Sequence, residues 1–111
     1  MNIHNISEEN SVLNHFLSQI REVTIQKDSM RFRRNMERIG EIMAYEISKK
    51  LTYSENTITT PLGIKNTTKI TEEVVLCSIL RAGLTLHQGF LNYFDAAENG
   101  FISAYRHHPN N

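Results

Sequence analysis

Apolar side chains recur at helical spacing through the first half of the chain. Ser7, with Glu8 and Glu9 after it, is typical of a helix start, and the first apolar set after it is Val12, Leu13, Phe16, Leu17 and Ile20. A second set has the clearest period, at steps of three or four residues: Phe32, Met36, Ile39, Met43 and Ile47. Asp28 or Ser29 can cap this second helix, which we expect to continue to about Lys50 and to bury one face.

The pattern changes to that of strands in the second half. Residues 57–60 (Thr-Ile-Thr-Thr) favour a strand, Pro61 to Gly63 interrupts it, and residues 65–70 can return as a hairpin-like arm. Residues 72–80 contain a continuous apolar run, typical of a strand buried on both faces of a parallel sheet. A helix should begin at Leu84 and end before an Asn99-Gly100 turn, with residues 101–105 as the next strand. Strand, helix and strand at this length predict one βαβ unit.

Arg81 is the first candidate for chemistry, because it interrupts the apolar run where the predicted strand ends. An unpaired charge is very costly inside a sheet, so we expect Arg81 on the loop. Ala82 and Gly83 let the backbone approach a ligand, and a helix opening at Leu84 would add free N–H groups. An arginine at a helix N-terminus favours an anion such as phosphate. Alternatively, Arg81 caps the sheet edge or pairs with a carboxylate such as Glu46.

Arg106 is the second candidate. It should lie one residue past the end of the second strand, at the same edge of the sheet as Arg81. Ligands of open α/β sheets bind at that carboxyl edge, and two guanidinium groups there could bracket a diphosphate. The simpler alternative is a solvated arginine in a mobile tail.

Composition narrows the classes of partner. Of 111 residues, 12 are Lys or Arg and 12 are Asp or Glu, so a formal net charge of zero argues against a nucleic-acid or membrane-surface binder. Cys77 stands alone inside the apolar run, which excludes an internal disulfide, favours a cytoplasmic protein and suggests a small buried side chain. The N-terminus lacks a signal peptide, and no stretch reaches the roughly 18 apolar residues of a membrane span.

Two other clusters have simple interpretations. His107 and His108 are adjacent, so on an extended chain they point to opposite sides, and no third ligand is spaced for a metal site. The arginines at positions 31, 33, 34 and 38 alternate with Glu37 and Glu41 on a helix. Ion pairs on a solvated face explain that pattern better than nucleic-acid binding.

Four segments, in order, resemble the uracil phosphoribosyltransferase family. Residues 78–84 (Ser-Ile-Leu-Arg-Ala-Gly-Leu) are similar to the family's "(P/S)ILRAGL" loop, which holds the diphosphate of phosphoribosyl pyrophosphate (PRPP). Phe32-Arg33, followed by Gly40, Ala44-Tyr45-Glu46 and Leu51, is similar to the family's "FR…G…YE…L" helix. Thr60-Pro61-Leu62-Gly63 is similar to the "TPLG" of its β-arm. Ala104-Tyr105-Arg106 is similar to its "YR" segment. The family has an acidic or polar residue after "YR", where this chain has His107.

The resemblance implies the N-terminal part of the type I phosphoribosyltransferase α/β fold, as a single incomplete domain over residues 1–111. We expect helices over 1–51, a β-arm over 52–71, a parallel βαβ unit over 72–106 and a truncated loop over 107–111. The implied reaction is uracil plus PRPP giving UMP and diphosphate. In that reaction Arg81, Ala82, Gly83 and Arg106 would bind the diphosphate, with no covalent nucleophile and no metal ligand from this chain.

The family's second half carries a "DPMLATGGS"-like ribose-phosphate loop and a uracil-recognising segment, and neither occurs here. The resemblance therefore implies an N-terminal fragment, inactive alone, whose Mg²⁺ would arrive with PRPP and be held through the missing half. A sheet cut after two strands leaves an apolar face and edges that invite self-association, so we expect a homo-oligomer. The main alternative is a non-catalytic oligomerisation or phosphate-binding module. A pyrimidine-sensing RNA-binding regulator on the same fold is a third, which the zero net charge disfavours.

Overall fold

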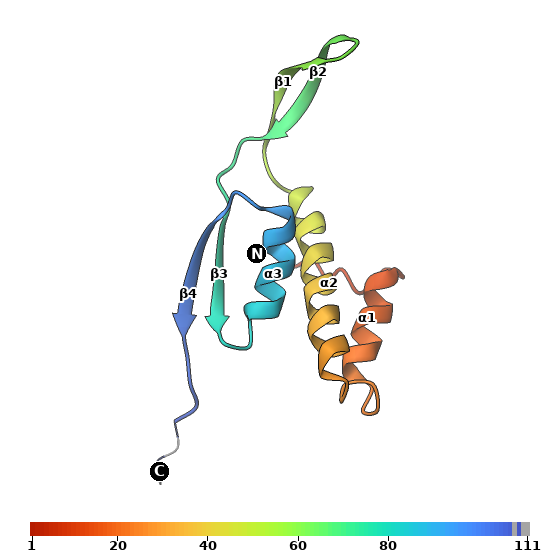
Figure 1. Cartoon of the computed structure of the whole chain (residues 1–111), viewed down its shortest axis with the longest axis vertical. Helices are drawn as coiled ribbons and strands as arrows, with labels where there is room; N and C mark the ends of the chain where they lie inside the picture. The colour runs from red at the N-terminus through yellow and green to blue at the C-terminus, as the bar shows by residue number, and fades with distance from the viewer. Residues whose placement is uncertain (108, 110–111) are drawn as a thin grey trace.

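Three helices and two separate two-stranded sheets make up the chain in a computed structural model, which describes residues 1–107 and 109 (Figure 1). The elements follow in this order: α1 (Val12–Arg21), α2 (Ser29–Ser48), β1 (Tyr53–Thr60), β2 (Gly63–Ile70), β3 (Val75–Leu80), α3 (Leu84–Tyr93) and β4 (Glu98–Ser103). Helix α3 lies between α2 and the β3–β4 pair, while β1 and β2 project away as an arm (Figure 1). The expected α/β architecture is confirmed. Among the described residues, no helix is both long enough and apolar enough to cross a membrane.

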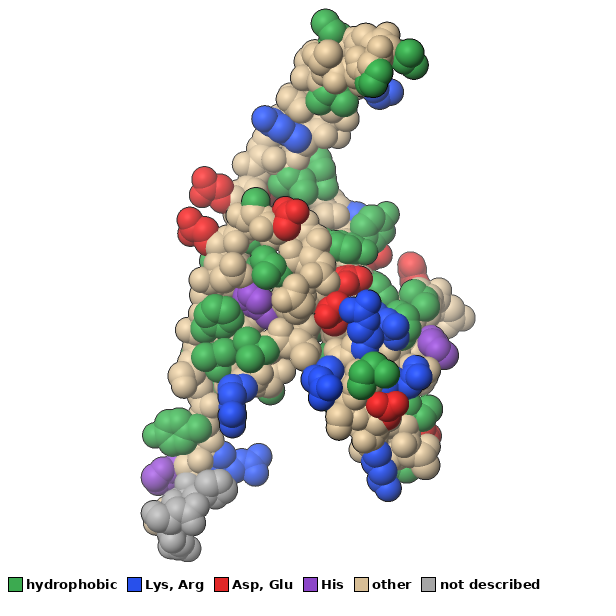
Figure 2. All heavy atoms as spheres, in the orientation of Figure 1, with side chains coloured by type: hydrophobic (Ala, Val, Ile, Leu, Met, Phe, Trp, Pro, Cys, Tyr) green, Lys and Arg blue, Asp and Glu red, His purple; other side chains and the backbone are tan. Residues whose placement is uncertain are grey.

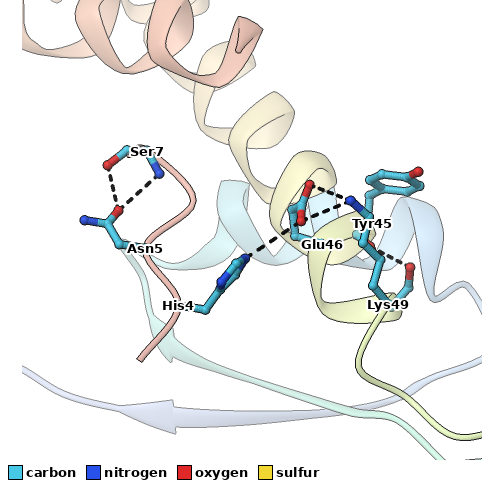
Figure 3. Close-up of polar contacts among 7 residues, drawn as sticks. His4, Asn5, Ser7, Tyr45, Glu46 and Lys49 are labelled. Carbon is cyan, nitrogen blue, oxygen red and sulfur yellow. Dashed lines mark hydrogen bonds and ion pairs between the residues drawn. The ribbon is translucent and has the colours of Figure 1, made fainter. Parts of the chain in front are cut away.

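The first helix begins later than the sequence pattern predicts. Its N-cap is Ser11, whose Oγ accepts a hydrogen bond from the Leu13 N–H at 3.2 Å. Ser7 is not a cap, because its N–H and Oγ both donate to Asn5 Oδ1, at 3.1 and 2.7 Å (Figure 3). Glu8 and Glu9 therefore lie outside the helix. The local Asn5 turn satisfies the polar groups that a cap at Ser7 would have used.

The second helix has the predicted cap, but it buries a different face from the predicted one. Asp28 Oδ1 accepts from the Arg31 N–H at 3.1 Å, and the helix ends at Ser48. Phe32 and Ile47, at the ends of the predicted apolar stripe, are 39% and 44% exposed. The buried side chains instead lie along a shifted line: Asn35, Ile39, Gly40 and Ala44. The line follows the contacts of both neighbouring helices, because α1 meets α2 at Asn35 and α3 meets it at Gly40.

A buried polar pair and a cation–π contact join α1 to α2. Asn35 is fully buried and donates through Nδ2 to Gln19 Oε1 at 2.7 Å, while its Oδ1 accepts from Arg38 at 3.0 Å. The Arg38 guanidinium also lies 5.3 Å from the centre of the Phe16 ring. The polar atoms of the buried amide are thus paired, as burial requires.

The predicted arm is an antiparallel hairpin with Pro61 and Leu62 at its turn. Tyr53 pairs with Ile70 at the base and Thr60 with Gly63 at the tip, where Gly63 takes a φ of 132°. That backbone conformation is open to glycine but strained for other residues. At the base, the Thr52 N–H donates to the Glu72 carboxylate.

The β3–β4 pair is parallel, as predicted, but its boundaries and burial differ from the prediction. Strand β3 begins at Val75 rather than residue 72, and Asn99-Gly100 lies inside β4 rather than in a turn. The turn comes earlier, where the Ala97 N–H donates to the Phe94 carbonyl at 3.1 Å.

One face of this pair is open, so the expectation of burial on both faces is wrong for this chain. Alternate residues of β3 point away from α3, and among them Val75 is 62% and Ile79 58% exposed. Cys77, between them, is exposed rather than buried. Figure 2 shows hydrophobic side chains over the two strands.

A contact between His4 and Glu46 joins the N-terminal segment to the last turns of α2 (Figure 3). Glu46 Oε2 lies 3.9 Å from His4 Nε2, and Glu46 Oε1 lies 3.2 Å from Lys49 Nζ. Glu46 is therefore engaged by these neighbours and forms no ion pair with Arg81. The alternative in which Arg81 pairs with Glu46 is wrong.

Candidate functional site

The turn between β3 and α3 holds Arg81 and Ala82 at the surface, where the strand leaves the sheet. The peptide bond between Leu80 and Arg81 is cis. The turn is closed by two backbone hydrogen bonds, from the Gly83 N–H to the Ile79 carbonyl at 3.0 Å and from the Leu84 N–H to the Arg81 carbonyl at 3.1 Å. Helix α3 begins at Leu84, as predicted.

Gly83 is required by this close approach of the turn to the strand. A Cβ at Gly83 would lie 2.8 Å from the Ile79 carbonyl oxygen, closer than carbon and oxygen can pack without a backbone shift. From the sequence, we expect Gly83 to let the backbone approach a ligand. The structure shows a further reason for glycine at this position, because β3 passes so close that a side chain would not fit.

Several N–H groups at this end of α3 are free to bind an anion. Gly83, the N-cap, supplies no capping side chain. In the part of the chain that the structure describes, the amides of Ala82, Thr85 and Leu86 donate to no acceptor. These amides, together with the positive end of the helix dipole, attract negative charge. Arg81 adds a guanidinium that forms no ion pair with any described carboxylate.

Arg106 lies at the same end of the sheet but farther along the chain than expected. Strand β4 ends at Ser103, so Arg106 is three residues past the strand rather than one. Strands β3 and β4 run in the same direction, and their carboxyl ends meet at one edge (Figure 1). Arg106 is exposed, in a segment without regular structure. The parallel pairing places both arginine-bearing segments at the carboxyl edge, and no described contact joins the two side chains.

A buried polar cluster that was not predicted from the sequence lies behind the turn. His87 of α3, only 8% exposed, lies between Ser78 of β3 and Asn99 of β4. The signal was present in the pattern. Ser78 occupies the inward-facing position between Leu76 and Leu80, and His87 shares the face of α3 that carries Phe90 and Phe94.

The remaining predicted clusters form surface contacts. Arg34 Nη1 lies 2.5 Å from Glu37 Oε2, and Arg31 Nε lies 3.7 Å from Asp28 Oδ2. The predicted pairing on this helix face is therefore found for Arg34. Within residues 1–107 and 109, no group of three or more His, Cys, Asp and Glu side chains is arranged to hold a metal ion. His108, half of the His107-His108 pair, lies outside the described residues.

The fold is shared with a solved structure. The AQ2163 protein from Aquifex aeolicus superimposes with a TM-score of 0.74 over 92% of this chain and 49% of its own, at 25% identity. The chain is thus an α/β protein with a β-arm and a parallel strand pair, whose first strand leads into the turn that carries Arg81.

Sequence comparison places it more narrowly. A family model described as uracil phosphoribosyltransferase matches residues 6–111, and the chain belongs to that family. It is 57% identical over 106 residues to a Porphyromonas gingivalis protein named uracil phosphoribosyltransferase, covering 96% of this chain and 49% of that protein. A Metallosphaera sedula protein of the same name is 34% identical over 83% of this chain and 43% of its own length. The chain therefore spans about half the length of the curated relatives that it matches.

Proposed function

We propose that this chain supplies the diphosphate-binding half of a uracil phosphoribosyltransferase site. The reaction would transfer phosphoribose from PRPP to uracil, giving UMP and diphosphate in pyrimidine salvage. One observation carries the proposal: Arg81, without a carboxylate partner among the described residues, shares the β3–α3 turn and the start of α3 with the unpaired amides of Ala82, Thr85 and Leu86. Arg106, at the same edge of the sheet, is the second proposed ligand.

The proposed role follows from where charge develops. As the bond between the anomeric carbon and the diphosphate oxygen breaks, that carbon bonds a uracil nitrogen, the nitrogen releases its proton to water, and the diphosphate gains negative charge. Guanidinium and amide donors already aimed at that charge stabilise it, by several kcal/mol in order of magnitude in a closed site. As the family resemblance implies, Mg²⁺ would arrive chelated by PRPP.

We expect the 111-residue chain alone to bind diphosphate without turnover. The family segments that grip ribose 5-phosphate and recognise uracil do not occur in its sequence. Formation of UMP by the isolated chain would contradict this part of the proposal. A cytoplasmic setting and an absence of nucleic-acid partners remain proposals, supported by the single cysteine and the zero net charge.

The experiment is a titration of the isotope-labelled chain with pyrophosphate and with Mg-PRPP, followed by amide NMR shifts. We expect saturable shifts in residues 80–86 and at Arg106, and their loss in Arg81→Ala. Arg33→Ala is the matched control, because it removes an exposed arginine of α2 instead. Equal binding by the wild-type chain and Arg81→Ala would overturn the proposed site.

A second candidate function is a non-catalytic assembly module, favoured by the open face of the β3–β4 pair. Val75, Ile79 and Ile102 on that face are 62%, 58% and 55% exposed. Parallel sheets bury both faces in folded proteins, so an uncovered one favours association between copies of the chain. A module that associates but does not bind pyrophosphate would match this candidate alone.

A further inference from the structure

A buried histidine joins the two strands and the helix that surround the 81–83 turn. His87 Nδ1 lies 2.5 Å from Ser78 Oγ in β3, and Nε2 lies 2.7 Å from Asn99 Oδ1 in β4. The ring also packs against Phe101, with 5.1 Å between the ring centres. One imidazole therefore contacts both strands from the first turns of α3.

The partners fix the tautomer of His87. Asn99 Nδ2 donates to the Ala97 carbonyl at 3.3 Å, which orients Asn99 Oδ1 toward the imidazole. An amide oxygen only accepts, so Nε2 carries the proton, and Nδ1 accepts the proton of the Ser78 hydroxyl. Both ring nitrogens are satisfied, as a buried polar group requires.

The hydrogen bonds of His87 span the candidate turn. Ser78 lies before the 81–83 turn and His87 after it, so their side-chain bond closes a loop around the turn. The backbone N–H of His87 donates to the Gly83 carbonyl at 2.9 Å, and the Gly83 N–H donates to the Ile79 carbonyl at 3.0 Å. Side-chain and backbone bonds thus both cross the turn and link it to β3.

We propose that His87, held by Ser78 and Asn99, is a positioning residue that orders the 81–83 turn for diphosphate before it binds. The inference rests on the proposed function of that turn. The His87 side chain is buried, so it does not reach the exposed surface of the turn where the anion would bind. An ordered turn binds more tightly because its amides and Arg81 need not be immobilised when the anion arrives.

The test compares pyrophosphate affinity and turn mobility in two variants. His87→Phe keeps an aromatic ring beside Phe101 but removes both hydrogen bonds, and Ser78→Ala removes only one. We expect the Kd for pyrophosphate to rise about tenfold in His87→Phe and by a smaller factor in Ser78→Ala. Hydrogen exchange at the Gly83 amide should accelerate in both.

Two controls separate positioning from general destabilisation. Gln88→Ala alters the neighbouring side chain, which donates to Asn92 Oδ1 at 2.7 Å and bonds no other residue among those described. Ile39→Val loosens a buried site on α2 that takes no part in the hydrogen bonds of His87. Both should leave the Kd of the folded chain and Gly83 exchange unchanged. In the wild-type chain, a long-range ¹⁵N–¹H spectrum should show a protonated Nε2 and an unprotonated Nδ1 at His87.

The outcomes distinguish the inference from the function on which it rests. Unchanged Gly83 exchange and unchanged Kd in Ser78→Ala would overturn the positioning role, even where His87→Phe fails to fold. A protonated Nδ1 with a bare Nε2 would overturn the hydrogen-bond assignment. A wild-type chain that binds no pyrophosphate would overturn the proposed function, while Gly83 exchange would still decide whether His87 orders the turn.

Discussion

Gly40 of α2 and Gly89 of α3 lie against each other where the two helices cross. A Cβ added at Gly89 would lie 2.9 Å from the Gly40 Cα, and one added at Gly40 would lie 2.5 Å from the Leu86 carbonyl oxygen. Two glycines in contact bring the helix backbones closer than any other residue pair allows. This crossing fixes α3, and with it the turn that carries Arg81, on the N-terminal helices.

Gly89→Ala should therefore destabilise the chain. The new methyl group would collide with the Glu37 carbonyl oxygen of α2, and overpacking of this kind costs about 1–3 kcal/mol, sometimes more. Urea unfolding followed by circular dichroism measures the loss. Gly100→Ala is the matched control, because its Cβ would meet only Cys77 Sγ at an ordinary 3.8 Å. Equal stability of the two variants would show that α2 and α3 separate freely.

Stability should depend on pH through Glu72 at the base of the arm. Hydrogen bonds from the Thr52 side chain and backbone N–H hold the pKa of Glu72 below its ordinary value of 4.5. The folded chain thus binds this proton less tightly than the unfolded chain. The contribution to stability is complete above about pH 4.5 and is lost as the pH falls through the lowered folded pKa.

Urea unfolding at a series of pH values tests this contribution. The difference in unfolding free energy between the wild-type chain and Glu72→Gln should shrink as the pH falls from about 6 to about 3. The effect should be small, because the carboxylate is exposed to water. Glu73→Gln, one residue along and also exposed, serves as the control. If this difference in unfolding free energy instead grows as the pH falls, the predicted direction of the Glu72 pKa shift is wrong.

Arg81→Lys separates charge from geometry at the candidate site. Lysine keeps the positive charge but loses the planar fork that binds two phosphate oxygens at once. We expect pyrophosphate affinity to fall about tenfold in Arg81→Lys, between the wild-type chain and Arg81→Ala. Calorimetric titration measures it, and Arg33→Lys on α2 provides the control. Affinity equal to that of the wild-type chain would show that Arg81 contributes only a point charge.

Local signals predicted much of this fold. Asp28 caps α2, Pro61 and Leu62 turn the arm, and α3 begins at Leu84, because each depends on residues within a few positions. The family resemblance in residues 78–84 likewise indicated the turn that the structure shows between β3 and α3. Capping, turn chemistry and short motifs are properties of neighbouring residues, so a sequence displays them directly.

The errors came from contacts between distant residues. Asn99-Gly100 has the composition of a turn, yet Asn99 is held in β4 by His87, twelve residues earlier. Serine is a common helix cap, but the Ser7 hydroxyl donates to Asn5 Oδ1 instead of capping a helix. Cys77 is exposed because its face of the sheet is open in the described chain. The residues next to Cys77 in the sequence do not reveal whether another element covers that face. Contacts between residues that are far apart in the sequence determine the structure at these positions, so a short stretch of sequence cannot predict it.

The open face of the β3–β4 pair should mediate self-association of this chain. Cys77 pairs with Gly100 and Ile79 with Ile102 across the two strands, so these residues share the face away from α3. Covering this face would remove apolar surface from water, which stabilises the associated form by roughly 25 cal/mol per Å² of apolar surface buried. We expect the wild-type chain to associate in sedimentation velocity as its concentration is raised.

Ile79→Lys should shift this equilibrium toward monomer, because a buried ammonium at the centre of the face would lose its hydration. The dissociation constant should rise about tenfold or more. Leu62→Lys adds the same charge at the tip of the arm, where Leu62 is fully exposed, and it should leave the equilibrium unchanged. The reverse result, with Leu62→Lys dissociating the chain and Ile79→Lys without effect, would assign the contact to the arm. A wild-type chain that stays monomeric at every concentration would remove self-association altogether.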